Sequence, residues 1–310
     1  MSERFVETNL IYKVVAGSRA FGLDTPESDL DTRGVCIPPA SHLLGLTEFE
    51  QLEEGTEAGH DVVYALVKFV RLALACNPNI METLYTGAEH VLFINDYGRR
   101  LVECRGLFLT RKAGDTFTGY AVSQLRRIEH HHRWLVSPPD HQPKPEEFGG
   151  WAVEGRYKFP DHDAQRAYAD ALKHWSLYQK WLRDRNPARA ELERRYGYDT
   201  KHAMHLLRLL KMGIEILETG EVHVYRPDRE WLKAVRGGLL SYEELLAIAG
   251  DCEARLARLK ESSSLPAEPD AAAANDLVVE LQERFLSDSR RTEGAREEGV
   301  GKIEPRTVAK

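Results

Sequence analysis

The sequence predicts an α+β protein in which a small mixed sheet with flanking helices is followed by a mostly helical second domain. Strand-like and helical stretches alternate through about the first 110 residues, as expected of a mixed sheet covered by helices. From Thr116 onward, apolar residues recur mostly at helical spacing, with proline-rich loops between the periodic segments. The 310 residues exceed the usual length of one domain, so we expect two cores.

Changes in composition divide the chain into three expected segments. Residues 1–112 would form the sheet-containing domain and residues 113–260 the helical domain. Residues 261–310 would comprise a linker, a short helix and, after about Ser287, a polar tail in which we expect disorder. Within the helical domain the periodicity predicts helices at residues 116–134, 163–185, 200–218, 228–236 and 241–260.

A strand that ends at a Gly-Ser pair is the first feature with chemical meaning. The apolar run Leu10–Ala16 is typical of a buried strand. Gly17 and Ser18 follow it directly, and glycine at this point allows the backbone to come close to a bound group. The pattern indicates a small-residue turn that contacts phosphate.

Two carboxylates, separated by one apolar residue, follow this turn. Residues two apart in a strand project on the same side, so we expect Asp29 and Asp31 to bind cations while Leu30 points into the core. Mg²⁺ prefers hard oxygen ligands and keeps water or phosphate oxygens in its shell, so the pair suits Mg²⁺, with Mn²⁺ as an alternative, and a nucleoside triphosphate. Phosphoryl or nucleotidyl transfer is the predicted reaction class, with metals stabilising both the attacking and the leaving oxygen.

Asp61 is the candidate for a third carboxylate. It opens the stretch 61–63, which is typical of a short strand entering a helix expected at Val63–Ala75, and an adjacent strand would bring Asp61 beside the pair. The alternative is that Asp61 caps that helix by accepting hydrogen bonds from its first free amides. Arg33 lies two residues beyond Asp31; it either holds the carboxylates or a phosphate, or is a surface ion-pair partner.

The predicted helix at residues 200–218 carries a second candidate site. Lys201, His205 and Arg208 fall within a stripe about 60° wide, opposite an apolar face. We therefore expect one buried side and one cationic side. The cationic side is either merely solvated or contacts the triphosphate or an acceptor phosphate.

A basic stretch rich in histidine invites two weaker interpretations. His130–His132, with His141, suggest zinc, but consecutive helical residues point about 100° apart and do not converge easily on one ion. Arg126 and Arg127, together with Arg133, would suit RNA, but no aromatic residues interleave with them. Trp134 and Trp151 are interpreted as packing residues.

Composition limits the class of protein. The net charge of −7 argues against a globally basic nucleic-acid-binding protein and confines any RNA binding to a local cleft. No apolar run approaches about 18 residues, and Glu3 and Glu7 stand where a signal peptide would be basic and then apolar. We expect a cytoplasmic protein with no membrane partner. A reducing compartment is also indicated by four cysteines without C-x-x-C spacing: Cys36, Cys76, Cys104 and Cys252.

The motifs resemble those of the polymerase-β nucleotidyltransferase superfamily. Its pattern is a hydrophobic residue, Gly-Ser, a spacer of about ten residues and Asp-hydrophobic-Asp, and the chain has VAGS at 15–18 and DLD at 29–31. Within the superfamily, the chain is similar to the RNA-ligase-associated polymerase-β-like nucleotidyltransferases. Three blocks between residues 17 and 222 carry this resemblance: GSRAFGLDTPESDLDTRGV, KFVRLALACNPNIMETLY and YDTKHAMHLLRLLKMGIEILETGEV.

The resemblance implies an enzyme that moves a nucleoside monophosphate from an NTP to an acceptor hydroxyl and releases pyrophosphate. It also implies that Gly17 and Ser18 contact the triphosphate, that Asp29 and Asp31 bind metal, and that Asp61 completes the carboxylate set. The expected acceptor is an RNA or tRNA end, in RNA repair or modification and in functional association with an RNA ligase. Two alternatives remain: nucleotidylylation of a protein or small molecule, and a nucleotide-binding module without catalysis.

Overall fold

The computed structural model describes the backbone of residues 4–56 and 59–300, and it divides the chain into two compact units. The first unit comprises residues 1–120, 209–230 and 252–310, and the second comprises residues 121–208 and 231–251. The chain passes from one unit to the other within helices rather than at linkers. The units are therefore discontinuous in sequence, unlike the contiguous segments that composition predicts.

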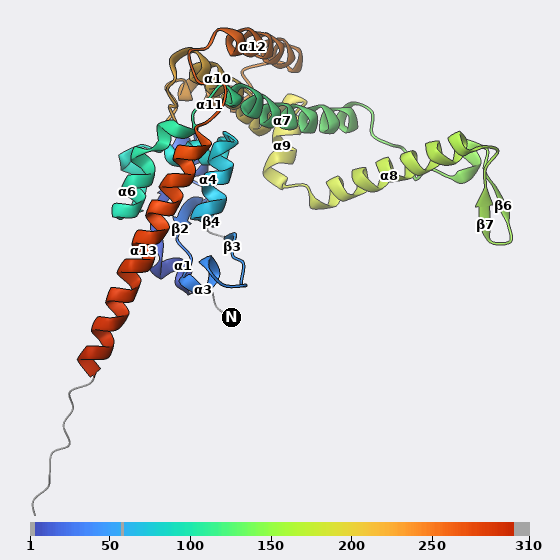
Figure 1. The fold of residues 1–310 in the computed structure, drawn as a ribbon. Coiled ribbons are helices and arrows are strands. Elements are labelled where there is room, and N and C mark those ends of the chain that lie inside the picture. The colour runs from blue at the N-terminus through green and yellow to red at the C-terminus, as the bar shows by residue number, and fades with distance from the viewer. Residues whose placement is uncertain (1–3, 57–58, 301–310) are drawn as a thin grey trace, which may run out of the picture. The chain divides into compact units, whose positions relative to one another are not determined.

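A five-stranded mixed sheet lies at the centre of the first unit (Figure 1), which confirms the predicted fold class. The strand order is β3-β4-β2-β1-β5. Strand β1 pairs antiparallel with β2 and with β5, β2 pairs parallel with β4, and β4 pairs antiparallel with β3. The strands span Leu10–Val15 (β1), Thr32–Cys36 (β2), Gln51–Thr56 (β3), Gly59–Ala65 (β4) and Val91–Ile94 (β5).

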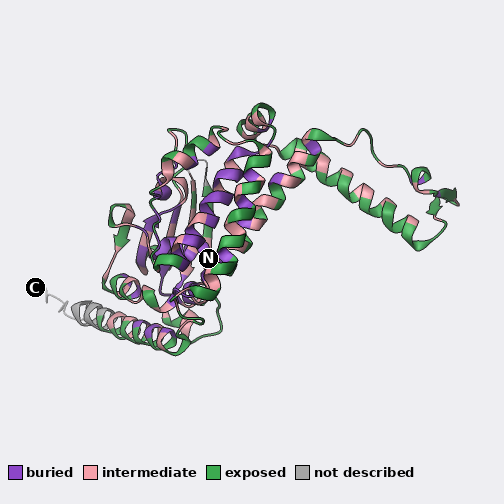
Figure 2. Ribbon diagram, turned by 90° about the horizontal axis from the view of Figure 1, so that it is seen from above, coloured by how far each residue is buried: buried purple, intermediate pink, exposed green. Residues whose placement is uncertain are grey.

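Helices pack on this sheet and close the core of the first unit. Figure 2 shows the buried residues concentrated on the strands and on the helices that cover them. Helix α4 begins three residues later than the predicted helix at Val63, because β4 continues to Ala65. The helices are α1 (Phe5–Thr8), α2 (Gly17–Phe21), α3 (Ala40–Leu43), α4 (Leu66–Leu74), α5 (Pro78–Leu84), η1 (Ala88–His90), α6 (Asp96–Glu103), η2 (Arg105–Phe108) and α13 (Ala271–Val300).

The Asn-Pro-Asn turn before α5 has a structural role. The Asn77 side chain accepts a hydrogen bond from the backbone N–H of Asn79 at 3.0 Å, and Pro78 occupies the first turn of the helix. Both features are typical helix-start signals. Met81 and Leu84 of α5 are fully buried. The turn therefore starts a helix that belongs to the core of the first unit.

The expected short helix and disordered tail are replaced by the long helix α13, which includes residues after Ser287. Its buried face holds Ala274, Leu277 and Leu281, and it packs against α4 (Figure 1). Tyr97 donates a hydrogen bond to Asp288 at 2.6 Å, which also ties α13 to α6. The spacing of three and four residues is helical, and the alanine-rich stretch interpreted as a linker begins this helix. The rest of the expected tail, residues 301–310, lies outside the described residues.

The second unit is mostly helical, as predicted. Its elements include η3 (Pro145–Phe148), the hairpin strands β6 (Trp151–Val153) and β7 (Arg156–Lys158), α8 (His162–Asp184) and α9 (Pro187–Tyr196). Four helices run through both units: α7 (Lys112–Val136), α10 (Thr200–Thr219), α11 (Arg229–Arg236) and α12 (Tyr242–Ser262). The hairpin and α9 have no counterpart among the predicted elements.

Two features concern the class of the whole chain. Among the residues that the structure describes, no helix is long and apolar enough to cross a membrane. All four cysteines are free thiols, and Cys36 and Cys76 are buried.

Replacing Leu281 by alanine tests whether α13 belongs to the core. Leu281 is 0 % exposed, whereas Val279 on the same helix is 42 % exposed. We expect Leu281→Ala to lower the free energy of unfolding by about 2–5 kcal/mol, because it leaves a cavity. Val279→Ala should change it by less than about 1 kcal/mol. Urea unfolding followed by circular dichroism measures both, and equal effects of the two substitutions would contradict the packing of α13.

Candidate functional site

Gly17 joins β1 to α2 in a conformation that favours glycine. Its φ is +65°, in the left-handed region, where a side chain is strained. A Cβ at this position would also collide with Oδ2 of Asp31. The positive φ favours glycine here, a side chain would also displace the Asp31 carboxylate, and the structure places that carboxylate directly against the Gly17-Ser18 turn.

Hydrogen bonds hold the segment that carries Asp29 and Asp31 next to α2. The Ala16 N–H donates to the carbonyl of Asp31 at 2.8 Å. The Arg19 guanidinium donates to the carbonyl of Ser28 at 2.7 Å and to that of Asp29 at 3.3 Å. The backbone before β2 is thus fixed through its carbonyl groups, and the two carboxylates are left for other contacts.

Asp29, Leu30 and Asp31 precede β2 rather than lying within it, because β2 begins at Thr32. Leu30 is 44 % exposed, so the expectation that it points into the core is wrong. The backbone explains the difference: Leu30 passes so close to Gly59, at the start of β4, that a Cβ there would collide with the Leu30 carbonyl. Asp29 is consequently exposed and Asp31 half-buried.

The charges of Asp29 and Asp31 are not neutralised by protein cations. Oδ1 of Asp31 accepts the backbone N–H of His60 at 3.2 Å. Within the described ranges, neither carboxylate forms an ion pair with lysine or arginine. Hard oxygen donors without a competing cation are the donor set that Mg²⁺ or Mn²⁺ takes, so these two residues fit the expected metal.

Asp61 lies on β4, next to β2 as predicted, but it is engaged differently. It pairs with Thr32 in the parallel ladder, and its carboxylate accepts Lys13 Nζ at 2.6 Å and the Thr32 hydroxyl at 2.5 Å. Directly paired residues share a face and successive residues alternate, so Asp61 lies on the face opposite Arg33. The alternative role as helix cap is wrong, since Ala65 is the N-cap of α4.

The three carboxylates are not gathered at one point. Among the described residues, Asp29, Asp31 and Asp61 do not form a group with ligand atoms within 4.8 Å of one another. A metal role for Asp61 therefore stays a prediction, and it would require Lys13 to release the carboxylate.

Arg33 connects β2 to α5. It donates to the backbone carbonyl of Asn79 at 3.1 Å and to its side-chain oxygen at 2.9 Å, and it forms an ion pair with Glu82 at 3.4 Å. The Glu82 side chain is only 4 % exposed. Arg33 is thus not a surface ion-pair partner. A role in holding the aspartates or a phosphate remains a prediction.

The expected solvated cationic side of the helix at 200–218 is wrong. Helix α10 has the predicted extent, but Arg208 is only 6 % exposed and Lys201 is partly buried. Burial, reinforced by the charges of Arg208 and Lys201, holds the pKa of His205 well below its usual range. His205 is therefore neutral at pH 7. These three residues belong to the second unit, and their predicted contact with phosphate stays a prediction.

A buried histidine on the same helix was missed by the sequence analysis. Arg189 lies 2.6 Å from Nε2 of His202, and since a guanidinium can only donate, Nε2 accepts. Nδ1 then carries the proton and donates to Gln124 at 2.8 Å. Burial lowers the pKa of His202 to about 4. The positive charge of Arg189 also lowers this pKa, and the negative charge of Asp199 only partly opposes the shift.

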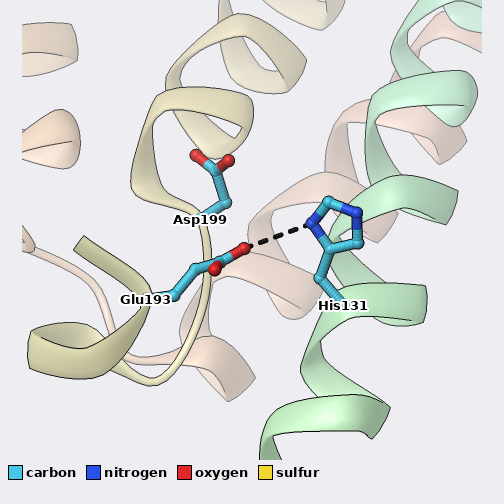
Figure 3. Close-up of side chains that lie close together, drawn as sticks. All are labelled: His131, Glu193 and Asp199. Carbon is cyan, nitrogen blue, oxygen red and sulfur yellow. Dashed lines mark hydrogen bonds and ion pairs between the residues drawn. The ribbon is translucent and has the colours of Figure 1, made fainter. Parts of the chain in front are cut away.

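His131, Glu193 and Asp199 lie together in the second unit, with ligand atoms within 4.8 Å of one another (Figure 3). Nδ1 of His131 donates to Glu193 at 3.2 Å. Burial alone would favour the neutral acid, but hydrogen bonds from His131 and Arg185 lower the pKa of Glu193. Arg189 pairs with Asp199 at 3.4 Å. Because two guanidinium groups already neutralise these carboxylates, the group is poorly suited to a metal ion.

The neighbouring histidines turn toward different partners, as the helical geometry predicts. His130 packs edge-on against Trp134 at 4.3 Å between ring centroids, and His132 stacks on Tyr242 at 3.8 Å. His141 contacts Glu147 at 2.7 Å.

A mixed sheet whose first strand ends in a Gly-Ser turn, with an aspartate against that turn, is the arrangement that the sequence motifs predict for the polymerase-β class. The model of the RNA repair pathway DNA polymerase beta family, RlaP, matches residues 2–280, so the chain belongs to that family. A crystal structure of a nucleotidyltransferase-like protein from Exiguobacterium sibiricum 255-15 matches with 15 % identity and a TM-score of 0.25. The match covers 84 % of this chain and 72 % of that one. The search of curated proteins gives no match.

Substitution of Gly17 tests the close approach at the site. We expect Gly17→Ala to lower the free energy of unfolding by about 1–3 kcal/mol, because of strain at positive φ, and to weaken Mn²⁺ binding, because the methyl group displaces Asp31. Gly119→Ala is the matched control, since Gly119 lies in α7 with open space around it. It should stabilise the protein by about 0.5–1 kcal/mol. Urea unfolding and calorimetric Mn²⁺ titration measure the two effects, and wild-type Mn²⁺ affinity in Gly17→Ala would contradict the geometry.

The lowered pKa of His202 should make the stability of the protein depend on pH. Its pKa is about 4 when folded and 6.5 in the unfolded chain, so between these values the unfolded chain binds more protons and stability falls as the pH falls. We expect His202→Gln to show a smaller drop in melting temperature between pH 7 and pH 5 than the wild type. His162→Gln, at an exposed position, should match the wild type. Identical pH profiles for all three proteins would contradict a buried neutral His202.

Proposed function

We propose that this protein transfers a nucleoside monophosphate from an NTP to the hydroxyl group of an RNA end and releases pyrophosphate. Membership of an RNA repair pathway polymerase-β family supports the reaction class and the choice of RNA. The observation that carries the proposal is the Asp31 carboxylate held against the Gly17 turn. It brings a group suited to cations beside the Gly-Ser turn that the sequence predicts to contact phosphate.

In this proposal the triphosphate lies beside Gly17 and Ser18, and Asp29 and Asp31 would hold the divalent cation. When bound, Mg²⁺ or Mn²⁺ supplies positive charge to the triphosphate and to the leaving pyrophosphate. The two aspartates suit this role because, among the described residues, they have no ion pair with lysine or arginine. Arg19 supports the role by fixing the backbone that carries them.

The transfer forms a bond between the acceptor oxygen and the α-phosphorus and breaks the bond from that phosphorus to the oxygen bridging to the β-phosphate. The hydroxyl proton needs an acceptor, and we assign it to Asp61. Lys13 holds Asp61 at 2.6 Å and Thr32 donates to its second oxygen. Asp61 can accept the proton only when Lys13 moves away. In this proposal, the ion pair between Lys13 and Asp61 therefore opens when the substrate binds.

The test is transfer of label from each α-labelled NTP, with Mg²⁺ or Mn²⁺, to an RNA end, to tRNA or to no added acceptor. We expect Asp29→Asn or Asp31→Asn to reduce the rate about a thousandfold or more, because a catalytic metal contributes several kcal/mol. Asp24→Asn is the matched control, since Asp24 is an exposed carboxylate in the same loop, and it should leave the rate within about twofold.

The outcomes separate the proposal from its alternatives. Label in RNA that requires both aspartates supports it. Label on the protein itself or on a small molecule would contradict the RNA acceptor. Stabilisation by NTP and Mg²⁺ without any turnover would contradict catalysis and favour a nucleotide-binding module.

A second set of variants separates the two roles of Asp61. If Asp61 is only the proton acceptor, Asp61→Asn lowers the transfer rate and leaves the Mn²⁺ affinity measured by calorimetry unchanged. If it is also the third metal ligand, the Mn²⁺ affinity falls as well. Lys13→Met, which removes the competing cation, should then bind Mn²⁺ more tightly than the wild type. Full activity of Asp61→Asn would contradict both roles.

A further inference from the structure

The second unit contains a cavity of about 990 Å³, a volume at the upper end of the range of ligand pockets. Helices α7, α8 and α9, the turn between α8 and α9, and the turn between α9 and α10 supply its lining. The residues on which the argument depends are Arg126, Arg127, Trp134, Lys180, Trp181 and Arg185. None of them belongs to the candidate catalytic site around Gly17.

One part of the lining is aromatic and held in place. The rings of Trp134 and Trp181 lie 5.2 Å apart between centroids, and the guanidinium of Arg185 lies 4.3 Å from the centre of the Trp181 ring. The Trp134 indole N–H donates to Nε2 of His174 at 3.0 Å, which fixes its orientation. Trp134 is only 5 % exposed and supports Trp181, which is half-buried. An indole ring beside a guanidinium group, as Trp181 is, offers a surface on which a nucleobase can stack.

The acidic groups of the cavity are already neutralised. Arg185 donates to Glu193 at 2.8 Å, and Arg189 pairs with Asp199 at 3.4 Å. Asp184 accepts a hydrogen bond from Arg183 at 2.9 Å. The negative charge that the sequence contributes to this region is therefore balanced by neighbouring arginines.

Three cations in the lining are available to an anion. Arg126, Arg127 and Lys180 are exposed at the cavity, and among the residues that the structure describes they form no ion pair. The cavity thus combines uncompensated positive charge with aromatic surface. A phosphate group attached to an aromatic base meets both requirements.

We infer that this cavity binds a nucleotide of a single-stranded RNA, with the base against Trp181 and the phosphate near Arg126, Arg127 and Lys180. The choice of an RNA strand rests on the proposed function. The net charge of −7 supports a local site, since only a cationic surface of this kind can attract a polyanion to an acidic chain. A free nucleoside triphosphate offers the same chemistry, and the experiment distinguishes the two sources.

The experiment measures binding rather than transfer. A short fluorescein-labelled single-stranded oligoribonucleotide is titrated with the full chain carrying Asp29→Asn and Asp31→Asn, in EDTA, and its anisotropy is followed. Arg126→Glu/Arg127→Glu removes two cations of the cavity, and Trp181→Ala and Trp181→Phe test stacking. The matched control is Arg156→Glu/Lys158→Glu, the same charge change at exposed positions of β7 in the same unit.

We expect Arg126→Glu/Arg127→Glu to weaken binding at least about tenfold and to reduce the slope of log Kd against log salt by roughly 1.4, for two lost phosphate contacts. Trp181→Ala should weaken binding about tenfold, and Trp181→Phe should retain most of the affinity. The β7 control should remain within about twofold. Circular dichroism of each variant confirms that it is folded.

Two results would overturn the inference. In the first, RNA does not bind, or binds with equal affinity to the wild-type cavity and to Arg126→Glu/Arg127→Glu. In the second, ATP displaces the oligoribonucleotide at concentrations below those at which unlabelled RNA does, which would assign the cavity to a free nucleotide. Because the aspartates at the catalytic site are already replaced, neither result depends on transfer. Conversely, failure of transfer in the native protein with intact RNA binding would contradict only the proposed function.

Discussion

The approach of Asp31 to the backbone at Gly17 is the constraint on which the candidate catalytic site depends. It exists because Gly17 has a positive φ and no side chain. The contact would be lost if the segment before β2 moved, and that segment is held by Arg19 and by its passage over Gly59. Backbone geometry, rather than side-chain packing, therefore keeps the carboxylate beside the turn, and Leu30 is left exposed as a result.

The acidic side chains of this chain differ in whether a lysine or arginine pairs with them. Glu82 and Glu193 are nearly fully buried and each is held by arginine, whereas within the described residues Asp29 and Asp31 have no such ion pair. A buried carboxylate needs a partner because desolvation disfavours its charge. Asp29 and Asp31 lie at a more exposed position, where water can solvate them until a cation arrives. This contrast, more than the Asp-x-Asp spacing itself, supports their proposed role.

Local patterns in the sequence were sufficient for most of the elements, though not for the β6–β7 hairpin, α9 or the length of α13, and not for the assembly of the elements. The strand at Leu10, the adjacency of Asp61 to β2 and the extents of α8 and α10 follow from periodicity and turn residues. The exposure of Leu30 depends on the distant Gly59, and the burial of Arg208 depends on what covers α10, so neither is encoded in neighbouring residues. The discontinuous units were hidden for the same reason, since helices rather than linkers connect them.

The cavity of the second unit brings the arginine pair on α7 close to aromatic residues, one of which is distant in the sequence. Arg126 and Arg127 lack interleaved aromatic residues, but Trp134 lies two turns further along the same helix and Trp181 comes from α8. Stacking surfaces are assembled from separate helices, so proximity along the chain is the wrong measure for them. The same holds for charge: a chain with a net charge of −7 has a cationic cavity here because ion pairs neutralise the acidic groups that line it. Binding of a polyanion is decided by this local balance, within about a Debye length, rather than by the net charge of the chain.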